Sequence, residues 1–281
     1  MPSRARLALY GAVASVALLI ATWFAAFHVG VFERADRSIL IGFMGLDRPR
    51  LHAITQFVAD LCNPTPYLYL AAVPVVVALI RRRPWLAAVI AVIMLGANET
   101  TQLLKPVLSS PRLITEPAAV VTGALPSGHA TAAMSLALCA VIAAPARVRP
   151  LVAATMAAFA IAVCYSILEL GWHYPSDVLG GFLVATAWTL VGVAALWTVQ
   201  ARRPSRVSIR GVGGGATSVA AALAPVAMVV IGALLAVAMI VVTRPYALVY
   251  AVEHGAFSLG AVAIGALALT ISTGATLALR R

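Results

Sequence analysis

The chain has 281 residues, of which 62% are hydrophobic and only 10% charged, and its mean hydropathy is +0.99. A soluble domain carries about 25% charged residues, so this composition excludes a water-soluble globular protein and a disordered chain. Three cysteines are too few and too scattered for a disulfide framework. The apolar residues form runs long enough to cross a bilayer as helices, which need about 20 residues each. The sequence therefore predicts an all-α membrane protein with many spans.

Eight apolar runs follow one another along the chain, and we interpret each as a membrane span. The first begins after Arg4 and Arg6 and ends without a clear cleavage site, so it is expected to be a retained anchor rather than a signal peptide. The runs cover residues 7–29, 66–80, 84–104, 128–144, 149–170, 175–199, 218–242 and 247–278.

Two segments between the runs have a different character. In 33–63, charged residues recur at helical spacing among apolar ones, which indicates one or two amphipathic helices lying at the membrane interface. In 202–216, Arg and Ser residues precede a run of Gly, as is typical of a linker. We therefore expect a six-span core over 1–201, a cytoplasmic linker, and a two-span tail over 217–281.

The net charge of +11 is divided unequally between the two sides of the membrane. In a soluble protein this excess would suggest a nucleic-acid partner, but here most basic residues lie in short loops between spans, where the positive-inside rule accounts for them. With a cytoplasmic N-terminus, the inner side holds 13 basic residues and no acidic one, and the outer side holds the other 7 basic residues. We therefore predict a protein of the cell membrane with both termini in the cytoplasm, and loops 105–127 and 171–176 on the opposite side.

Residues suited to phosphate chemistry gather at the ends of four spans, all expected at the outer face. Because the spans form one bundle, these residues can converge in one polar pocket. They are Lys105 and Arg112 after the third span, Pro126, Ser127, Gly128 and His129 at the start of the fourth, Ser166 near the end of the fifth, and His173 and Asp177 at the start of the sixth.

The chemistry of these residues is coherent. The cations Lys105 and Arg112 attract an anion, and a helix N-terminus at Gly128 offers backbone N–H groups to it. Two histidines can serve as nucleophile and general acid. His173 and Asp177 are four residues apart, so the carboxylate can accept from one imidazole nitrogen and make the other a better nucleophile, as in Ser-His-Asp triads. Attack on phosphorus would give a phosphohistidine.

Each residue alone also has an ordinary structural interpretation. Lys105 fits a cation snorkelling at a helix end, Ser127 fits an N-cap, and Asp177 fits a first-turn acid stabilised by the helix dipole. A purely structural explanation would require all of them to fall by chance on one face of the membrane, which favours the functional interpretation. Glu99, inside the third span, is interpreted as a structural partner of the pocket, and Glu169 has no assigned role.

The same residues resemble the three motifs of the type 2 phosphatidic acid phosphatase (PAP2) family of integral membrane lipid phosphatases. The second motif, P-S-G-H, is complete at 126–129. The first, K-x6-R-P, lacks its proline, which Leu113 replaces, and the third, S-R-x5-H-x3-D, lacks its arginine, which Ile167 replaces. The resemblance covers roughly residues 50–200 and a core of six spans. The remaining matching positions are Lys105, Arg112, Ser166, His173 and Asp177.

The resemblance implies a role for each matching residue. His173 would be the nucleophile, Asp177 its partner and His129 the general acid. No metal or other cofactor is implied. The substrate phosphate would be held by Lys105, Arg112, Ser127, Gly128 and Ser166.

The resemblance also implies a phosphatase that acts on a membrane lipid phosphate or diphosphate at the outer face. Polyprenyl diphosphate, phosphatidic acid, phosphatidylglycerol phosphate and a polyprenyl-phosphoryl sugar phosphate all fit. Two alternatives remain open: a non-catalytic lipid-phosphate binding or transport protein on the same scaffold, and a lipid phosphotransferase. The missing arginine at Ile167 favours the non-catalytic alternative, whereas the intact His129, His173 and Asp177 argue against it.

The exchange at Ile167 predicts a weakened enzyme, because losing one preorganised donor to a transition state typically costs about 10²–10³ in rate. Arg244, in the expected outer loop between the two tail spans, is a candidate replacement. If the place of the arginine is vacant, Ile167→Arg is expected to raise kcat.

Overall fold

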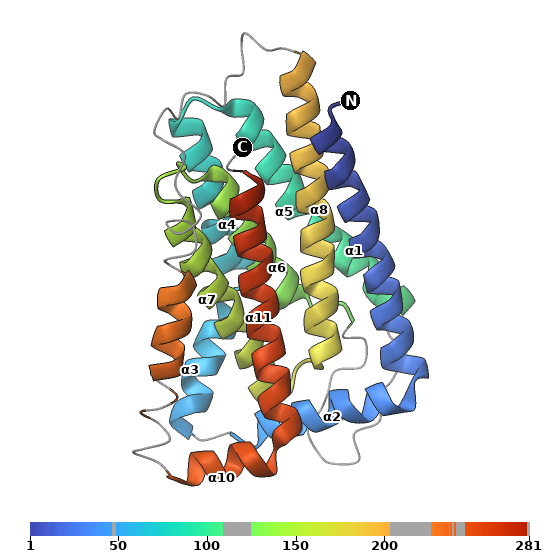
Figure 1. The fold of residues 1–281 in the computed structure, drawn as a ribbon, viewed down its shortest axis with the longest axis vertical. Helices are drawn as coiled ribbons and strands as arrows, with labels where there is room; N and C mark the ends of the chain where they lie inside the picture. Colours follow the sequence, from blue (N-terminus) through green and yellow to red (C-terminus); the bar gives the residue numbers. More distant parts are fainter. Residues whose placement is uncertain are drawn as a thin grey trace.

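The described residues of this computed structural model, 1–46, 49–108, 125–202, 226–235, 237, 239 and 245–279, are almost entirely helical (Figure 1). Most helices run along the long axis of a bundle, whereas α2 and α10 lie across one end of it (Figure 1). The helices are α1 (Ser3–His28), α2 (Gly30–Met44), α3 (Pro49–Asp60), α4 (Pro64–Ile80), α5 (Pro84–Leu108), α6 (Gly128–Ala143), α7 (Arg149–Glu169), α8 (Pro175–Arg202), α10 (Pro245–Glu253) and α11 (Gly255–Ala278), with a further short helix at Val226–Leu235.

The predicted all-α membrane bundle is confirmed. Within the described residues, α1, α5, α7, α8 and α11 are long and apolar enough to cross a bilayer, and α3 with α4 makes a sixth candidate that is bent by 58°. Helix α6 has 16 residues, about 24 Å at 1.5 Å per residue, which is shorter than the apolar core of a bilayer. The run at 247–278 is divided at His254, so the long helix begins only at Gly255.

The amphipathic segment forms two helices, as its charge spacing predicts. Helix α2 lies across the end of the bundle, as an interfacial helix would (Figure 1). Helix α3 instead packs against α7 and leads into α4. Its position relative to a bilayer stays a prediction.

Helix α6 occupies the centre of the bundle, between α5, α7 and α8. Every residue from Ala130 to Ala143 except Ala140 is buried, and all of these but Thr131 and Ser135 are apolar, as expected for a helix enclosed on all sides. Many of these residues are alanines, which allow close approach between helices in a membrane. The short central helix therefore places its N-terminus, and the motif residues there, inside the bundle.

The last helix packs on the core rather than standing apart from it. Helix α11 lies against α7 and α2, and the Tyr165 hydroxyl donates to the Ala261 carbonyl at 2.5 Å. At the far end, Arg149 donates to the carbonyls of Val141, Ala144 and Leu279. The predicted linker lies outside the described residues apart from Arg202, and the run at 218–242 is described only in part.

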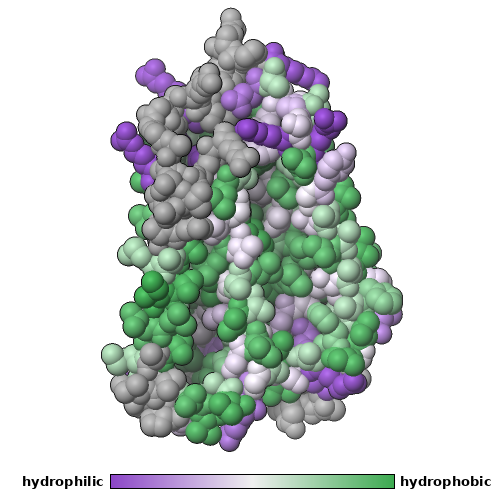
Figure 2. All heavy atoms as spheres, viewed as in Figure 1, coloured by the Kyte–Doolittle hydropathy of each residue, from purple (hydrophilic) through white to green (hydrophobic). Residues whose placement is uncertain are grey.

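Side-chain polarity divides the surface along the bundle axis. In the view of Figure 2, apolar residues cover most of the middle, and hydrophilic ones lie at the end where the termini lie and also at the opposite end. At that end the described loops and helix ends carry only basic charges, whereas the described acidic residues belong to the other end or to the middle of α5. The basic residues are Arg4, Arg6, Arg81, Arg82, Arg83, Arg147, Arg149 and Arg202.

Candidate active site

The N-termini of α6 and α8 meet inside the bundle, and a glycine allows them to touch. A Cβ atom on Gly181 would lie 2.7 Å from the carbonyl oxygen of Ser127 and 2.9 Å from the backbone nitrogen of Thr131. The Ser127 N–H donates to the Asp177 carbonyl at 2.9 Å, and the Thr131 hydroxyl donates to the Ser127 carbonyl at 2.8 Å. The second and third motifs are therefore joined by direct backbone contact.

This contact predicts that Gly181→Ala destabilises the protein. The obstructing atoms belong to the backbone of α6 and cannot rotate away, so α8 must shift, at a cost of about 1–3 kcal/mol for an overpacked site. Thermal unfolding in detergent measures the loss, and activity should fall with it because the motifs separate. Gly274→Ala in α11 is the matched control, since its Cβ would meet nothing within 4 Å. An unfolding temperature for Gly181→Ala equal to that of the control would contradict the close contact.

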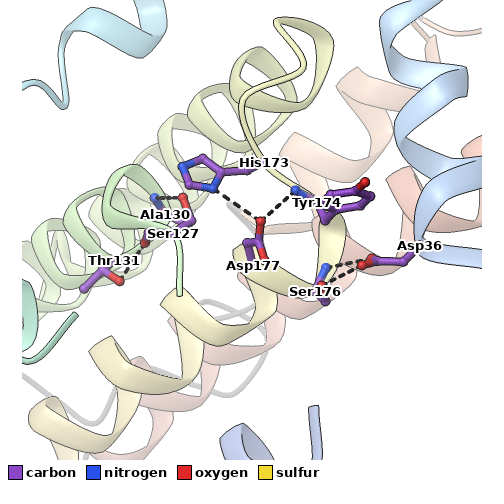
Figure 3. Close-up of polar contacts among 8 residues, drawn as sticks. All are labelled: Asp36, Ser127, Ala130, Thr131, His173, Tyr174, Ser176 and Asp177. Atoms are coloured by element: carbon purple, nitrogen blue, oxygen red, sulfur yellow. Dashed lines mark hydrogen bonds and ion pairs between the residues drawn. The ribbon is translucent and has the colours of Figure 1, made fainter. Parts of the chain in front are cut away.

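His173 and Asp177 form a buried pair at the start of α8 (Figure 3). His173 Nδ1 lies 3.4 Å from Asp177 Oδ2, and the two side chains are 10% and 1% exposed. The same carboxylate oxygen accepts from the Tyr174 N–H at 2.9 Å, which fixes the carboxylate beside the ring. With Nδ1 turned to the carboxylate, Nε2 is the nitrogen left to react. The geometry has the form of the His-Asp half of a catalytic triad.

His129 is the second residue of α6 and faces this pair. Its ring centroid lies 6.3 Å from that of His173 and 5.5 Å from that of Trp172. Its Nε2 lies 3.1 Å from Asn63 Oδ1. Two imidazoles held this close can act on the same substrate group, one by attacking it and the other by exchanging a proton with it.

Lys105 and the N-terminus of α6 complete a cationic corner of the site. A Cβ on Gly128 would lie 3.6 Å from Lys105 Nζ and 3.4 Å from Gln102 Nε2, so both donors reach the helix start, and a side chain there would crowd them. The Ser127 hydroxyl accepts from the Ala130 N–H at 3.3 Å and caps α6 (Figure 3). A helix N-terminus beside an ammonium group favours an anion.

Comparisons with known proteins bear on this arrangement. The model of the PAP2 superfamily matches residues 85–204, which include α5 to α8 and all the site residues described above except Asn63. The crystal structure of a transmembrane PAP2-type phosphatidylglycerolphosphate phosphatase from Bacillus subtilis is similar to the fold, with a TM-score of 0.56 and 20% identity over 69% of this chain and 98% of that one. No functionally curated protein matches the chain by sequence.

The PAP2 match confirms the resemblance and supports a phosphatase activity, without specifying the substrate. Of the eight predicted site residues, the structure brings together Lys105, Ser127, Gly128, His129, His173 and Asp177. Ser166 is buried near the end of α7, and its carbonyl accepts from the Leu170 N–H. Arg112 lies outside the described residues, as does Arg244.

Ile167, where the PAP2 motif has arginine, has no exposed surface and belongs to an apolar cluster with Met134, Leu168 and Phe182. The Ile167 side chain is therefore enclosed by other side chains and does not stand at an open position. An arginine at this position would have to displace the side chains that pack around it.

Three polar residues near the site were not predicted from the sequence as site residues. Asn63, between α3 and α4, contacts His129. Asp36 of α2 accepts from the Ser176 N–H at 2.9 Å and from the Ser176 hydroxyl at 2.6 Å (Figure 3), which holds the first turn of α8 from outside the bundle. Gln102 of α5 places its side-chain amide beside Gly128. Glu99 is exposed on α5, and Glu169 accepts from the Thr55 hydroxyl at 2.7 Å.

Proposed function

We propose that the protein is a phosphatase of a membrane lipid phosphate or diphosphate that acts through a phosphohistidine at the outer face of the cell membrane. One observation carries the proposal: His173, paired with Asp177, faces His129 across 6.3 Å between ring centroids, at the N-terminus of α6. Covalent phosphoryl transfer requires a nucleophile, a carboxylate that orients it and a group that exchanges protons with the substrate.

The reaction follows from the positions of these groups. The phosphate sits at the start of α6, where Lys105 and the backbone N–H groups balance its charge. His173 Nε2 attacks phosphorus while the Nδ1 proton stays directed at Asp177. The bond to the leaving oxygen breaks, and His129 gives that oxygen a proton. Water then attacks the phosphohistidine, giving its proton to His129, and releases inorganic phosphate and free His173.

The substrate class rests on the surroundings of the site. Apolar residues cover most of the middle of the bundle face seen in Figure 2, as in a protein surrounded by lipid, so we expect a substrate with a lipid tail to arrive from the bilayer. The structural neighbour is a phosphatidylglycerolphosphate phosphatase, which makes this lipid the first substrate to test. Phosphatidic acid, polyprenyl diphosphate and a polyprenyl-phosphoryl sugar phosphate complete the panel.

The test is release of phosphate from this panel by the purified protein in detergent. Turnover in the presence of EDTA is expected, because the mechanism uses only side chains and backbone groups. Tight binding without release would contradict catalysis and favour the lipid-phosphate binding protein. Transfer of the phosphate only when an acceptor lipid is added would favour the phosphotransferase.

The orientation gives a separate prediction. The end of the bundle that carries only basic charges is expected in the cytoplasm, so the site end faces outward. Glu33→Cys, exposed on α2 at the site end, should react in intact cells with a membrane-impermeant thiol reagent. Arg147→Cys, exposed at the opposite end, should react only after the membrane is opened. The described native cysteines, Cys62, Cys139 and Cys164, are buried. The reverse labelling pattern would overturn the orientation.

A further inference from the structure

A chain of polar side chains leads away from His129 to the junction of α3 and α4. His129 Nε2 lies 3.1 Å from Asn63 Oδ1. On its other side the Asn63 amide donates from Nδ2 to Asp60 Oδ1 at 2.9 Å. Two hydrogen bonds thus join a carboxylate, an amide and the imidazole in a row.

The Asp60 carboxylate determines which group donates and which accepts in each hydrogen bond of this series. An ionised carboxylate can only accept hydrogen bonds, so the Asn63 NH₂ group must face Asp60 and its carbonyl oxygen must face His129. A carbonyl oxygen also only accepts, so the proton of the neutral imidazole belongs on Nε2. Nδ1 of His129 is then the nitrogen available to the reacting group.

The Asn63 side chain does not cap its own helix, which leaves it available to His129 and Asp60. Asn63 is the N-cap residue of α4, a position where asparagine ordinarily accepts from the first N–H groups of its own helix. Here the side chain makes no such bond to the described first turn of α4. The backbone N–H of Asn63 donates to the Asp60 carbonyl at 3.0 Å. A tight turn between α3 and α4 therefore holds Asn63 and Asp60 next to each other.

We propose that Asn63, held by Asp60, is a positioning residue that fixes the ring orientation and tautomer of His129, so that Nδ1 delivers the proton to the leaving oxygen. The proposal rests on the phosphatase function proposed above. As His173 Nε2 forms its bond to phosphorus and the phosphorus–oxygen bond breaks, the proton moves from Nδ1 of protonated His129 to the leaving oxygen, which departs as an alcohol. His129 remains neutral with its proton on Nε2, still donated to Asn63. In the second half, Nδ1 accepts a proton from the attacking water.

Substrates with different leaving groups distinguish a positioning role of Asn63 from a merely structural one. An alkoxide leaving from a lipid phosphate needs the proton, whereas the nitrophenolate of 4-nitrophenyl phosphate does not. General acid catalysis contributes typically about 10²–10⁴ in rate. Asn63→Ala should therefore lower the rate of phosphohistidine formation from phosphatidic acid by about 10–100-fold, with a change below about 3-fold in its formation from 4-nitrophenyl phosphate, followed as the first burst of nitrophenolate. The control Gln56→Ala removes another donor to the same Asp60 oxygen, from 2.9 Å, and should leave both rates unchanged.

A double substitution tests the direction of the chain. Asp60→Asn combined with Asn63→Asp exchanges the amide and the carboxylate, so that the carboxylate accepts from His129 Nε2 and the amide donates to it. This pair should recover most of the rate that Asn63→Ala loses on phosphatidic acid. Recovery also shows that the loss in the single variant is not caused by misfolding.

The outcomes separate the two proposals. If the wild-type protein hydrolyses neither ester, the phosphatase function is wrong and the role of Asn63 falls with it. If the wild type hydrolyses both esters and Asn63→Ala lowers both rates equally, or neither, the phosphatase stands and the positioning role is overturned. A double variant as slow as Asn63→Ala would likewise contradict the role of the Asp60 carboxylate.

Discussion

Replacing His173 by alanine is expected to abolish phosphate release from every substrate, including activated aryl phosphates. No other described side chain combines a nucleophilic nitrogen with a buried carboxylate partner at the start of α6. The expected loss is at least about 10⁴-fold, comparable with disabling one member of a catalytic triad. Phosphate release from the lipid panel and from 4-nitrophenyl phosphate measures it, with the unfolding temperature as a check on the fold.

His129→Ala provides the contrast. It should lower turnover of lipid phosphates by about 10²–10⁴, yet leave formation of the covalent intermediate from 4-nitrophenyl phosphate largely intact. Acid-labile, base-stable radiolabel on the protein after brief exposure to labelled substrate would report the phosphohistidine. Label on the His173→Ala variant, or equal losses for both variants on the activated ester, would show that the two histidines do not have separate roles. Vanadate should inhibit the wild type, since it can adopt the five-coordinate geometry of phosphorus during the attack.

The sequence predicts which candidate site residues lie close together because the relevant information is local. Each motif lies at a helix end, and span counting places those ends on one side of the membrane. The pairing of His173 with Asp177 follows from a spacing of four at a helix start, and the structure places the two atoms 3.4 Å apart. The resemblance to PAP2 motifs adds the order of the residues and is confirmed over residues 85–204.

The partners of these residues could not be predicted in the same way. Asp36 and Ser176 are 140 positions apart, and only the packing of α2 across the end of the bundle brings them together. Asn63 has the sequence pattern of an ordinary helix cap before Pro64. Its contact with His129 depends on the 58° bend between α3 and α4, and hydrophobic periodicity alone gives no indication of that angle.

Helix ends show the same limit. The run at 247–278 predicts one span, because only one acidic residue, Glu253, and one histidine, His254, interrupt it. The structure divides it there into α10 and α11. Composition predicts which segments are apolar, but the way α11 packs on α7 and α2 is determined by side chains distant in sequence, such as Tyr165.

Ile167→Arg is expected to destabilise the protein severely rather than restore a faster enzyme. The motif comparison alone favours a gain, since an arginine at this position would complete the third motif. However, the Ile167 side chain is fully buried among apolar residues, and a guanidinium there would be a buried charge with no carboxylate partner among the apolar residues of that cluster. Leaving a buried charge without a partner costs about 3–5 kcal/mol, which is a large part of the stability of an ordinary domain.

The control for this variant is Ile167→Val, which removes one methylene group and should cost about 0.5–1.5 kcal/mol, with turnover close to that of the wild type. Thermal unfolding in detergent and the yield of monodisperse protein measure the difference between the two variants, and kcat on phosphatidic acid is measured for each. A well-folded Ile167→Arg protein with a higher kcat would show that the guanidinium reaches the phosphate, and that the apolar cluster around Ile167 can open towards the site. The expected result is the opposite. Because the Ile167 side chain lies in the apolar cluster, the described groups placed to balance a phosphate charge are Lys105 and the N-terminus of α6.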